Sequence, residues 1–283
     1  MKIAIVGLGM VGKAYAEFFQ RHAAYEVTGI DVNRIECDVR FTQGFSGMRV
    51  SDNQRVEEAR RADLIVLCLP TEKQSDGSPD LTAIEWWLLK LSAHNGVVLI
   101  KSTVPPGFTQ HWRDKTGVPL VHSPEFLGAN RYYTPPHYLN PSEVHTHPFV
   151  ILGGAPKDAE FVQQVMLPIV GPSCEFNFCS STESEMVKYV VNSWGAMKVV
   201  MWGEYHDLCK AAGVNFANVR TLALKDKRIE PMHTAVFAEQ KGYGSSHCFS
   251  KDMPALAHLA GQLGVPMEMV SAAMRKNGEW NQG

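Results

Sequence analysis

One cysteine in this sequence is placed where a thiol could react. Cys248 lies in the stretch GYGSSHCFSKD, between small flexible residues and the charged pair Lys251-Asp252. The run KDMPAL, which begins at Lys251, is typical of a helix start, and the positive end of a helix stabilises a thiolate. The ordinary alternative is that Cys248 is one of six cysteines and, like most, a small buried hydrophobic residue. His247 precedes it, but adjacent side chains usually point apart, so a Cys-His dyad is not expected.

Three polar residues could assist such a thiol. Lys188 and Asn192 are four residues apart in a predicted helix, so they share one face and could together donate hydrogen bonds to a developing oxyanion. A solvated pair on an exposed face is the alternative, which spacing alone favours. Glu125, in SPEFLG, follows a predicted strand, where an isolated glutamate is usually solvated.

A glycine-rich turn near the amino terminus predicts a dinucleotide site. In KIAIVGLGMVGKAYAEFF, Gly7, Gly9 and Gly12 follow a predicted strand and open a predicted helix. Gly7 permits the tight turn, Gly9 lets a pyrophosphate approach the backbone, and Gly12 allows close packing of helix and strand. The next strand ends at Asp31, about 20 residues after Gly12, where a carboxylate binds the adenosine ribose and repels a 2′-phosphate. We therefore expect NAD rather than NADP.

Two later loops should line the same cleft. Pro70-Thr71 and Ser102-Thr103 each follow a strand of the predicted sheet, and ligands of such sheets lie beyond the carboxyl ends of the strands. The alternative is that these small polar residues mark only turns. No metal site is expected, because the HTH sequence at residues 145–147 lacks a third ligand and the six cysteines form no CxxC pair.

The elements that hold these residues predict a Rossmann-like doubly wound parallel sheet followed by a mostly helical domain. Short runs rich in Val, Ile and Leu suit a parallel sheet that is covered on both faces. The runs are KIAIVG, YEVTGID, ADLIVLCLP, GVVLIKS, VPLVHS and PFVILGG. We expect residues 1–180 to form the NAD-binding domain, with a proline-rich excursion at residues 128–148.

A long helix dominates the remainder. It begins at Ser181 and runs for about thirty residues, with apolar positions on a stripe wide enough to face more than one neighbour. We expect residues 181–283 to form a helical domain built on this central helix, and the chain to form a homodimer through it.

Overall composition excludes some classes of partner. The chain has 283 residues and a formal net charge of −2, which argues against nucleic acid or an anionic membrane as the main partner. The first apolar run is too short for a signal peptide, and no segment approaches the ~20 apolar residues of a membrane span. We expect a cytoplasmic protein.

Taken together, these motifs resemble the UDP-glucose/GDP-mannose 6-dehydrogenase family. The matching segments, in chain order, are GLGMVG, Asp31, LPT at 69–71, KSTVPPG at 101–107, SPEFL at 123–127, ESEMVKYVVN at 183–192, DKRI at 226–229 and GYGSSHCFSKD. The resemblance implies an enzyme that oxidises the primary alcohol of a UDP-sugar or similar nucleotide sugar to a uronic acid. It also implies two steps, each reducing one NAD+, and an enzyme-bound thioester.

The resemblance implies catalytic roles for the polar residues. Cys248 would be the nucleophile that traps the aldehyde as a thiohemiacetal, and Lys188 and Asn192 would stabilise the oxyanions. Glu125 would activate water to hydrolyse the thioester. Asp252 and Thr103 would organise water and proton transfer.

Binding roles follow from the same resemblance. Arg228 would hold the substrate from a neighbouring subunit, and Phe126, Leu127 and Gly244 would contact it. Met10 and Val11 would join the glycines, Asp31 and the two cleft loops in binding NAD.

Three features depart from the family pattern. The usual C-terminal nucleotide-binding domain is expected to be absent, since the sequence stops at NGEWNQG. The nucleophile is preceded by SSH instead of GGx, and Ser250 stands where the family has proline. The loop after PEFLG is proline-rich and lacks the usual Arg-Glu-Gly.

Two other functions stay open. One is a two-electron 3-hydroxyacid dehydrogenase, which also uses a Lys-Asn pair on a central helix but needs no cysteine. The other is a non-catalytic NAD-binding remnant.

Overall fold

The computed structural model describes residues 1–32, 34–37, 51–128, 143–237 and 241–281, with only the backbone of residues 34–37. These residues form two compact units. The first comprises residues 1–71 and 80–188, and the second comprises residues 72–79 and 189–283. Residues 129–142 of the predicted proline-rich excursion lie outside the described residues.

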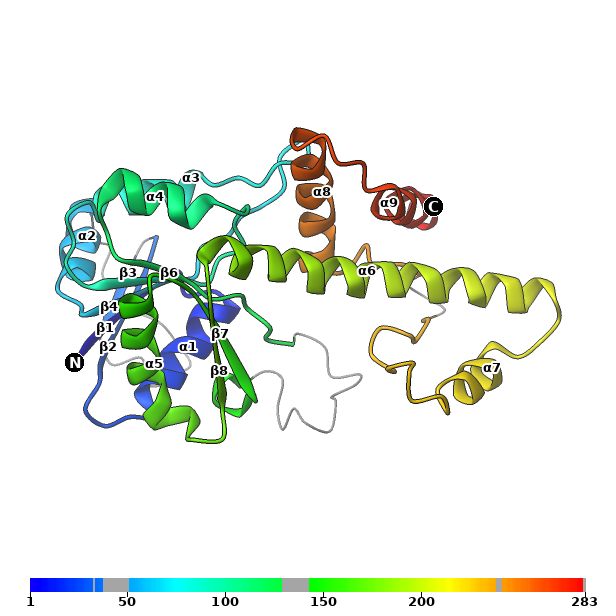
Figure 1. Cartoon of the computed structure of the whole chain (residues 1–283), viewed down its shortest axis with the longest axis horizontal. Coiled ribbons are helices and arrows are strands. Elements are labelled where there is room, and N and C mark those ends of the chain that lie inside the picture. Colours follow the sequence, from blue (N-terminus) through cyan, green and yellow to red (C-terminus); the bar gives the residue numbers. More distant parts are fainter. Residues whose placement is uncertain (33, 38–50, 129–142, 238–240, 282–283) are drawn as a thin grey trace. The chain divides into compact units, whose positions relative to one another are not determined.

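An eight-stranded sheet forms the centre of the first unit (Figure 1), with the order β3-β2-β1-β4-β5-β6-β7-β8. The strands are β1 (Lys2–Val6), β2 (Glu26–Asp31), β3 (Arg34–Cys37), β4 (Leu64–Leu67), β5 (Val97–Ile100), β6 (Leu120–His122), β7 (Phe149–Gly154) and β8 (Glu175–Cys179). Strands β1, β2, β4, β5 and β6 run parallel to one another, whereas β3 runs antiparallel to β2 and β7 antiparallel to β6. Strand β8 is parallel to β7. The predicted doubly wound sheet is confirmed, and the carboxyl ends of its five parallel strands lie at one edge.

Helices cover both faces of the sheet because successive strand residues point to opposite sides. On one face, residues such as Ile3 and Leu99 pack against α1 (Met10–Gln20) and α5 (Pro156–Val170). On the other, residues such as Ile65 and Val98 pack against three helices, which are α2 (Asp52–Arg60), α3 (Thr82–Lys90) and α4 (Phe108–Thr116). The two-sided burial explains why these strands are continuously apolar.

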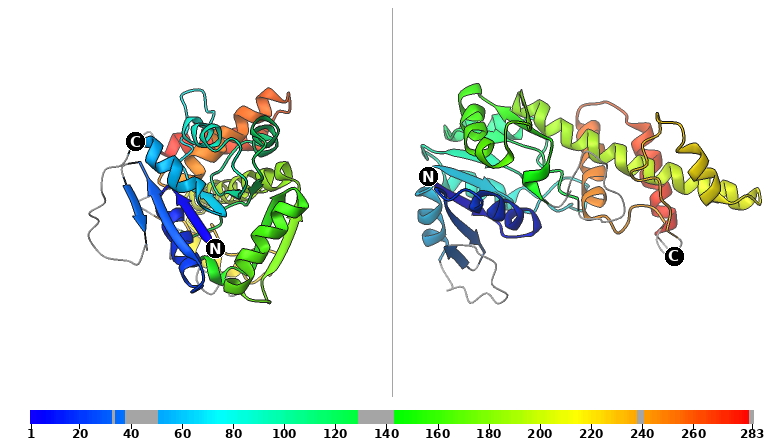
Figure 2. Two further views of the ribbon diagram at one scale, coloured as in Figure 1. Left: turned by 90° about the vertical axis from the view of Figure 1, so that its left-hand side faces the viewer. Right: turned by 90° about the horizontal axis from the view of Figure 1, so that it is seen from below.

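The predicted long helix is α6 (Ser181–Ala211), continuous in the right-hand view of Figure 2. Ser180 and Glu183 begin it with a reciprocal capping box, in which the Ser180 N–H donates to Glu183 Oε2 at 2.8 Å and the Glu183 N–H to Ser180 Oγ at 3.2 Å. Beyond residue 188 it packs in the second unit with α8 (His247–Gln262) and α9 (Glu268–Trp280). Helix α7 (Phe216–Ala223) follows α6 in the chain.

Helix α8 begins earlier than the sequence pattern predicts. The prediction placed its start at the KDMPAL run, which begins at Lys251. In the structure it begins at His247, since the Ser246 hydroxyl accepts the Phe249 N–H at 3.2 Å and so caps the end. Pro254 therefore lies inside the helix, and Cys248 becomes its second residue.

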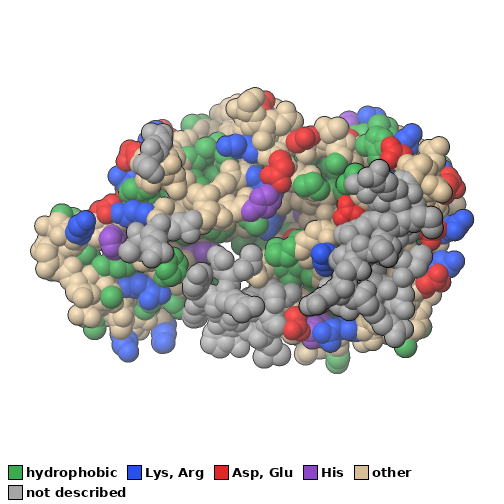
Figure 3. All heavy atoms as spheres, turned by 180° about the vertical axis from the view of Figure 1, so that it is seen from behind, with side chains coloured by type: hydrophobic (Ala, Val, Ile, Leu, Met, Phe, Trp, Pro, Cys, Tyr) green, Lys and Arg blue, Asp and Glu red, His purple; other side chains and the backbone are tan. Residues whose placement is uncertain are grey.

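The visible face in Figure 3 mixes Lys and Arg side chains with Asp and Glu. This interspersed pattern fits the small net charge of the chain. Within the described ranges, none of the helices combines the length and the hydropathy needed to cross a membrane.

Candidate functional site

The glycine turn after β1 has the geometry of a dinucleotide cradle. Gly7 has a positive φ of 89°, and a Cβ there would lie 2.4 Å from the Cys68 carbonyl oxygen. A Cβ on Gly12 would lie 1.8 Å from the Gly7 carbonyl oxygen, so both positions require glycine. A Cβ on Gly9, the N-cap of α1, would meet nothing within 4 Å. The turn is therefore closed on the protein side and open on the side where a pyrophosphate would lie.

The first turn of α1 leaves its backbone donors available. No side chain caps it and it contains no acidic residue. Met10 is exposed and Val11 is half-buried beside the open turn. Backbone N–H groups at such a helix end favour an anion.

Asp31, the last residue of β2, reaches this turn. Its Oδ2 accepts the Leu8 N–H at 2.9 Å, and its Oδ1 accepts the Val32 N–H at 2.6 Å. Each carboxylate oxygen has a further lone pair that could accept a ribose hydroxyl. Together, the turn and the carboxylate fit a dinucleotide.

The loops after β4 and β5 are tied to each other. Ser102 Oγ accepts the Leu69 N–H at 2.9 Å and donates to the Leu69 carbonyl oxygen at 2.8 Å. Thr71 is buried, Thr103 is half-buried and Pro70 is exposed. Ser102 therefore joins the two predicted cleft loops, a more specific task than forming a turn.

Glu125 is not the solvated loop glutamate that its isolation suggested. It is only 9% exposed, and its Oε1 accepts the N–H groups of Phe126 and Leu127, both at 2.8 Å. Its Oε2 lies 3.4 Å from Lys101 Nζ. Burial alone would raise the pKa of Glu125, but the charge of Lys101 and the Leu127 N–H outweigh it, so the pKa lies below its ordinary value.

Lys101 is a residue of this site that the sequence analysis did not select. It follows β5 directly and is 4% exposed. The only available signal was its place at the head of the KSTVPPG motif, at the end of a buried strand. Its partner, Glu125, is more than twenty residues away in the chain, so local sequence carries no sign of the pair.

Lys188 lies beside Glu125 in the first unit. Its Nζ donates to the main-chain carbonyl oxygen of Glu125 and is 5.6 Å from the centroid of the Phe126 ring. Both Lys188 and Asn192 are buried, so the alternative of a solvated pair is wrong.

Close packing against β7 brings the first turns of α6, and with them Lys188, next to Glu125. A Cβ on Gly153 of β7 would lie 2.3 Å from Ser184 Cβ, so glycine there permits the approach. Glu185 accepts the N–H groups of Gly107 at 2.6 Å and Thr109 at 2.8 Å, joining α6 to the start of α4. Burial raises the pKa of Glu185 to about 7 in spite of these hydrogen bonds.

In the second unit, Asn192 and Asp252 form a buried pair. Asn192 Nδ2 donates to Asp252 Oδ2 at 2.5 Å. The other oxygen of Asp252 accepts from Lys251 Nζ at 2.6 Å, and Asp252 is 3% exposed. Both oxygens of this carboxylate therefore have defined partners.

Cys248 is exposed and unbonded to other cysteines in the first turn of α8. His247 Nε2 lies 3.4 Å from Glu72 Oε1, and within the described part of the second unit no hydrogen bond joins His247 to Cys248. That the two form no dyad stays a prediction. The alternative of a buried cysteine is wrong.

The loop before Cys248 is anchored on α9. The Tyr243 N–H donates to Asn277 Oδ1 at 2.7 Å. Side chains at Gly242 and Gly244 would approach Asn277 and Asn281 to 2.4 Å and 2.3 Å, so neither position has room for one. Gly244 thus has a structural role, which leaves its predicted contact with the substrate a prediction.

Ser250 makes a contact that a proline could not. Its hydroxyl donates to the carbonyl oxygens of Tyr243 at 3.4 Å and Gly244 at 3.3 Å. The departure at this position therefore replaces a rigid ring with a hydroxyl that holds the glycine loop.

Arg228 is exposed in the second unit. Its side chain is 90% exposed and pairs with Asp226, with Nη2 2.6 Å from Oδ2. That local ion pair is weak in water and leaves the guanidinium accessible.

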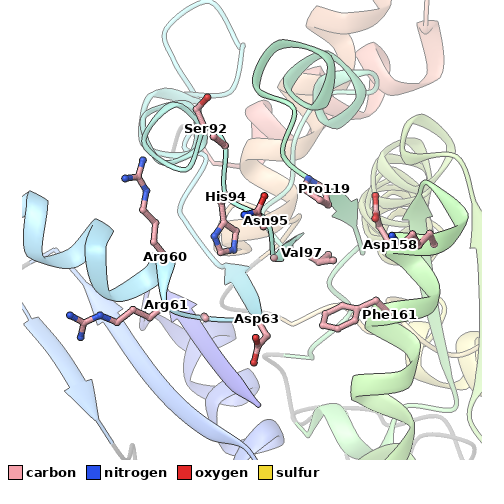
Figure 4. A pocket seen from close by; sticks show the side chains of 14 residues that line it. Arg60, Arg61, Asp63, Ser92, His94, Asn95, Val97, Pro119, Asp158 and Phe161 are labelled. Atoms are coloured by element: carbon pink, nitrogen blue, oxygen red, sulfur yellow. The ribbon is translucent and has the colours of Figure 1, made fainter.

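A cavity lies elsewhere in the first unit. It has a volume of about 840 Å³ and lies at the amino ends of β4 and β5, where His94, Asn95 and Asp158 line it (Figure 4). None of the predicted site residues contributes to it. It is therefore at the opposite edge of the sheet from the glycine turn.

Comparison with known proteins agrees with the motifs. Residues 182–279 match the model of the UDP-glucose/GDP-mannose dehydrogenase family, central domain. The UDP-glucose 6-dehydrogenase of Bacillus subtilis is 26% identical, with 98% of this chain and 66% of the relative covered. The GDP-mannose 6-dehydrogenase of Pseudomonas aeruginosa is 25% identical, with 98% and 68% covered. The chain thus spans about two thirds of the length of these relatives.

Solved structures agree in fold. A UDP-glucose dehydrogenase from Pyrobaculum islandicum superposes with a TM-score of 0.77 at 24% identity, covering 98% of this chain and 68% of that one. The 3-hydroxyisobutyrate dehydrogenase of Mycobacterium tuberculosis superposes with a TM-score of 0.66 at 13% identity, covering 97% and 91%.

Proposed function

Since this chain belongs to the UDP-glucose/GDP-mannose dehydrogenase family, we propose that it oxidises the primary alcohol of a nucleotide sugar to a carboxylate in two NAD-dependent steps. UDP-glucose and GDP-mannose, named in the relatives, are the first substrates to consider. The observation that carries the proposal is an exposed Cys248 on the same helix as a buried Asp252 that is bound to Asn192.

The cofactor would bind to the glycine turn of the first unit. The open side of Gly9 and the free N–H groups of α1 would take the pyrophosphate, and Asp31 the ribose hydroxyls. When bound, NAD+ supplies the hydride acceptor for both oxidations. A cofactor-binding domain at residues 1–180 and a catalytic domain at residues 181–283 stay predictions.

Cys248 would perform the covalent step. Its thiolate would add to the carbon of the aldehyde formed in the first oxidation, giving a thiohemiacetal. Loss of a hydride and a proton from that adduct gives a thioester. Lys188 and Asn192 would stabilise the negative oxygen, and Asp252, whose carboxylate Asn192 and Lys251 hold, would organise water with Thr103.

Glu125 would complete the reaction as a general base. It would take a proton from the water that attacks the thioester, and the carbon–sulfur bond would break to release the acid and the Cys248 thiolate. A carboxyl group whose pKa is below its ordinary value is ionised near neutral pH, as a base must be.

A homodimer is proposed through α6. Apolar side chains on one stripe of the helix are exposed in the single chain, namely Val190, Trp194, Met201, Tyr205 and Leu208. A stripe of this length is typical of a buried helix interface. Arg228, accessible on its own chain, would then hold the substrate of the partner. A cytoplasmic location stays a prediction.

A two-electron 3-hydroxyacid oxidation is the second candidate. The likeness to 3-hydroxyisobutyrate dehydrogenase, which extends over 91% of that chain, favours it on fold alone. It would yield one NADH for each substrate and would not need Cys248.

The deciding experiment counts NADH. The protein would be incubated with NAD+ and UDP-glucose, GDP-mannose or 3-hydroxyisobutyrate, with Cys248→Ala as the control. Two NADH for each sugar, and a sugar adduct on Cys248 detected by intact-protein mass spectrometry, are expected for the wild type. One NADH from the hydroxyacid, unchanged in Cys248→Ala, would select the second candidate. No turnover and no adduct with any substrate would reject both.

A further inference from the structure

We propose that Lys101 is a positioning residue for Glu125, holding its carboxylate ionised and oriented for thioester hydrolysis. The inference rests on the proposed function and assigns a task to a residue outside the predicted catalytic set. It is carried by the geometry of a buried ion pair within the first unit.

The ammonium group of Lys101 is fixed by its own hydrogen bonds. Its Nζ donates to Ser123 Oγ at 3.1 Å and to the Pro124 carbonyl oxygen at 3.0 Å. An ammonium group has three donors, so one remains to face Glu125 Oε2 at 3.4 Å. The Tyr15 ring packs against the same group, with its centroid 4.9 Å from Nζ. Lys101 therefore presents a charge in one place instead of moving as a surface lysine does.

The carboxylate of Glu125 is divided into a held oxygen and an available one. Oε1 accepts two main-chain N–H groups, those of Phe126 and Leu127. Oε2 is buried and forms no hydrogen bond of good geometry with the described residues, although the Tyr15 hydroxyl interacts with the Glu125 carboxylate. Oε2 is thus the oxygen that can receive a proton, and it is the one that Lys101 faces.

Other titratable groups near Glu125 supply less charge to Oε2. They are Tyr15 on α1, Cys68 after β4, His147 after η1 (Val144–Thr146) and Lys188 on α6. Burial raises the pKa of both Tyr15 and Cys68, so neither is charged near neutral pH.

The two remaining cations act from less direct positions. Lys188 donates to the main-chain oxygen of Glu125, not to its carboxylate. Lys101 lowers the pKa of Glu125 more than Lys188 or His147 does. Lys101 is therefore the main counter-ion.

The step itself needs no further reactant. Water attacks the thioester carbon, Glu125 Oε2 takes the proton, and the carbon–sulfur bond breaks to release the Cys248 thiolate. Burial lowers the pKa of Lys101, and the charge of Glu125 opposes that shift, so the ion pair helps Lys101 to keep its proton. Without it, a carboxyl group buried to this degree would favour its neutral form, which cannot act as a base.

The kinetic test compares Lys101→Met with a matched loss of another buried lysine. Lys198→Met is the control, because Lys198 is also buried and also binds a carboxylate, that of Glu230. With UDP-glucose and NAD+, Lys101→Met should still form two NADH in the first turnover. The acyl adduct on Cys248 should then accumulate, with kcat at pH 7 lowered about 10²–10⁴-fold. The acid limb of the kcat profile should move to higher pH.

Rescue and control variants separate positioning from loss of structure. Lys101→Arg keeps the charge, so the acid limb of its kcat profile should lie close to the wild-type pH. In Lys198→Met the acid limb should lie at the same pH as in the wild type. An acid limb of the kcat profile that is unchanged in Lys101→Met would overturn the proposal. So would an equal loss of rate in the two oxidation steps without an acyl adduct on Cys248.

A second measurement does not depend on turnover or on the folding of a lysine variant. The carboxyl absorption of Glu125 can be titrated by infrared difference spectroscopy of the wild type against Glu125→Gln. We expect Glu125 to lose its proton below the ordinary glutamic acid pKa of ~4.3. A pKa of Glu125 above that value would overturn the role of Lys101. A wild type that shows the lowered pKa of Glu125 but no turnover would reject only the proposed function.

Discussion

Asn192 on α6 and Asp252 on α8 are joined by a 2.5 Å hydrogen bond in the interior of the second unit. Asp252 is 3% exposed; Lys251 compensates its charge at one oxygen, and Asn192 satisfies the other by a hydrogen bond. The bond links the helix of the Lys-Asn pair to the helix of the exposed cysteine.

Replacing Asp252 with Asn keeps the size of the side chain and removes its charge. We expect kcat with UDP-glucose to fall about 10²–10⁴-fold, because water and protons near the reacting carbon lose their acceptor. Steady-state NADH formation measures this, and circular dichroism monitors the fold. Asp114→Asn, at an exposed site on α4, is the control and should keep full activity. A variant Asp252→Asn with wild-type kcat would contradict the assigned role.

Alanine at two glycines of the first turn should separate stability from cofactor binding. Gly12→Ala places a Cβ 1.8 Å from a carbonyl oxygen, so the free energy of unfolding should fall by roughly 1–3 kcal/mol. Gly9→Ala meets no protein atom within 4 Å and should unfold like the wild type. It should nevertheless bind NAD+ about tenfold more weakly, because the new methyl group occupies the side proposed for the pyrophosphate. Urea unfolding and calorimetric titration measure the two effects. Equal NAD+ affinity in Gly9→Ala and the wild type would place the cofactor elsewhere.

Glu185 should make the stability of the first unit depend on pH. Burial raises its pKa to about 7, above that of the unfolded chain, so the folded protein binds the extra proton between those values. The free energy of unfolding should therefore decrease as pH rises from about 4.5 to 7, by about 3 kcal/mol, and this contribution should be constant above. Urea titrations at several pH values measure this slope. Glu185→Gln, which cannot ionise, should flatten it, and an unchanged slope in that variant would assign the dependence to another group.

The apolar stripe of α6 should hold the proposed dimer together. Trp194 is 60% exposed in the single chain, and Trp194→Glu should weaken association by roughly 2 kcal/mol or more. Sedimentation velocity over a range of concentrations measures the change. Met269→Glu, at a site on α9 that is 77% exposed, is the control and should leave the assembly unchanged. A wild type that stays monomeric at high concentration would reject the interface.

The local chemistry of the chain determined most of the fold. Runs such as those ending at Val6 and Ile100 are continuously apolar because both faces of the sheet are covered, and this can be predicted without knowing what covers them. The edge strands β3 and β8 were not predicted. In β8, all five residues are at least partly exposed, so the hydrophobic pattern gives little signal. The start of α8 was predicted at Lys251, four residues late, since the Ser246 cap begins the helix at His247.

The sequence by itself determined which groups could do chemistry, from the glycines after β1 to the Lys-Asn pair and Cys248. Only the tertiary structure decided how these groups are paired. Lys101 meets Glu125 because β5 and β6 are neighbours in the sheet, and Asn192 meets Asp252 because α6 packs on α8. Burial and charge pairing depend on contacts between residues far apart in the chain, whereas a motif records only what lies close together along it.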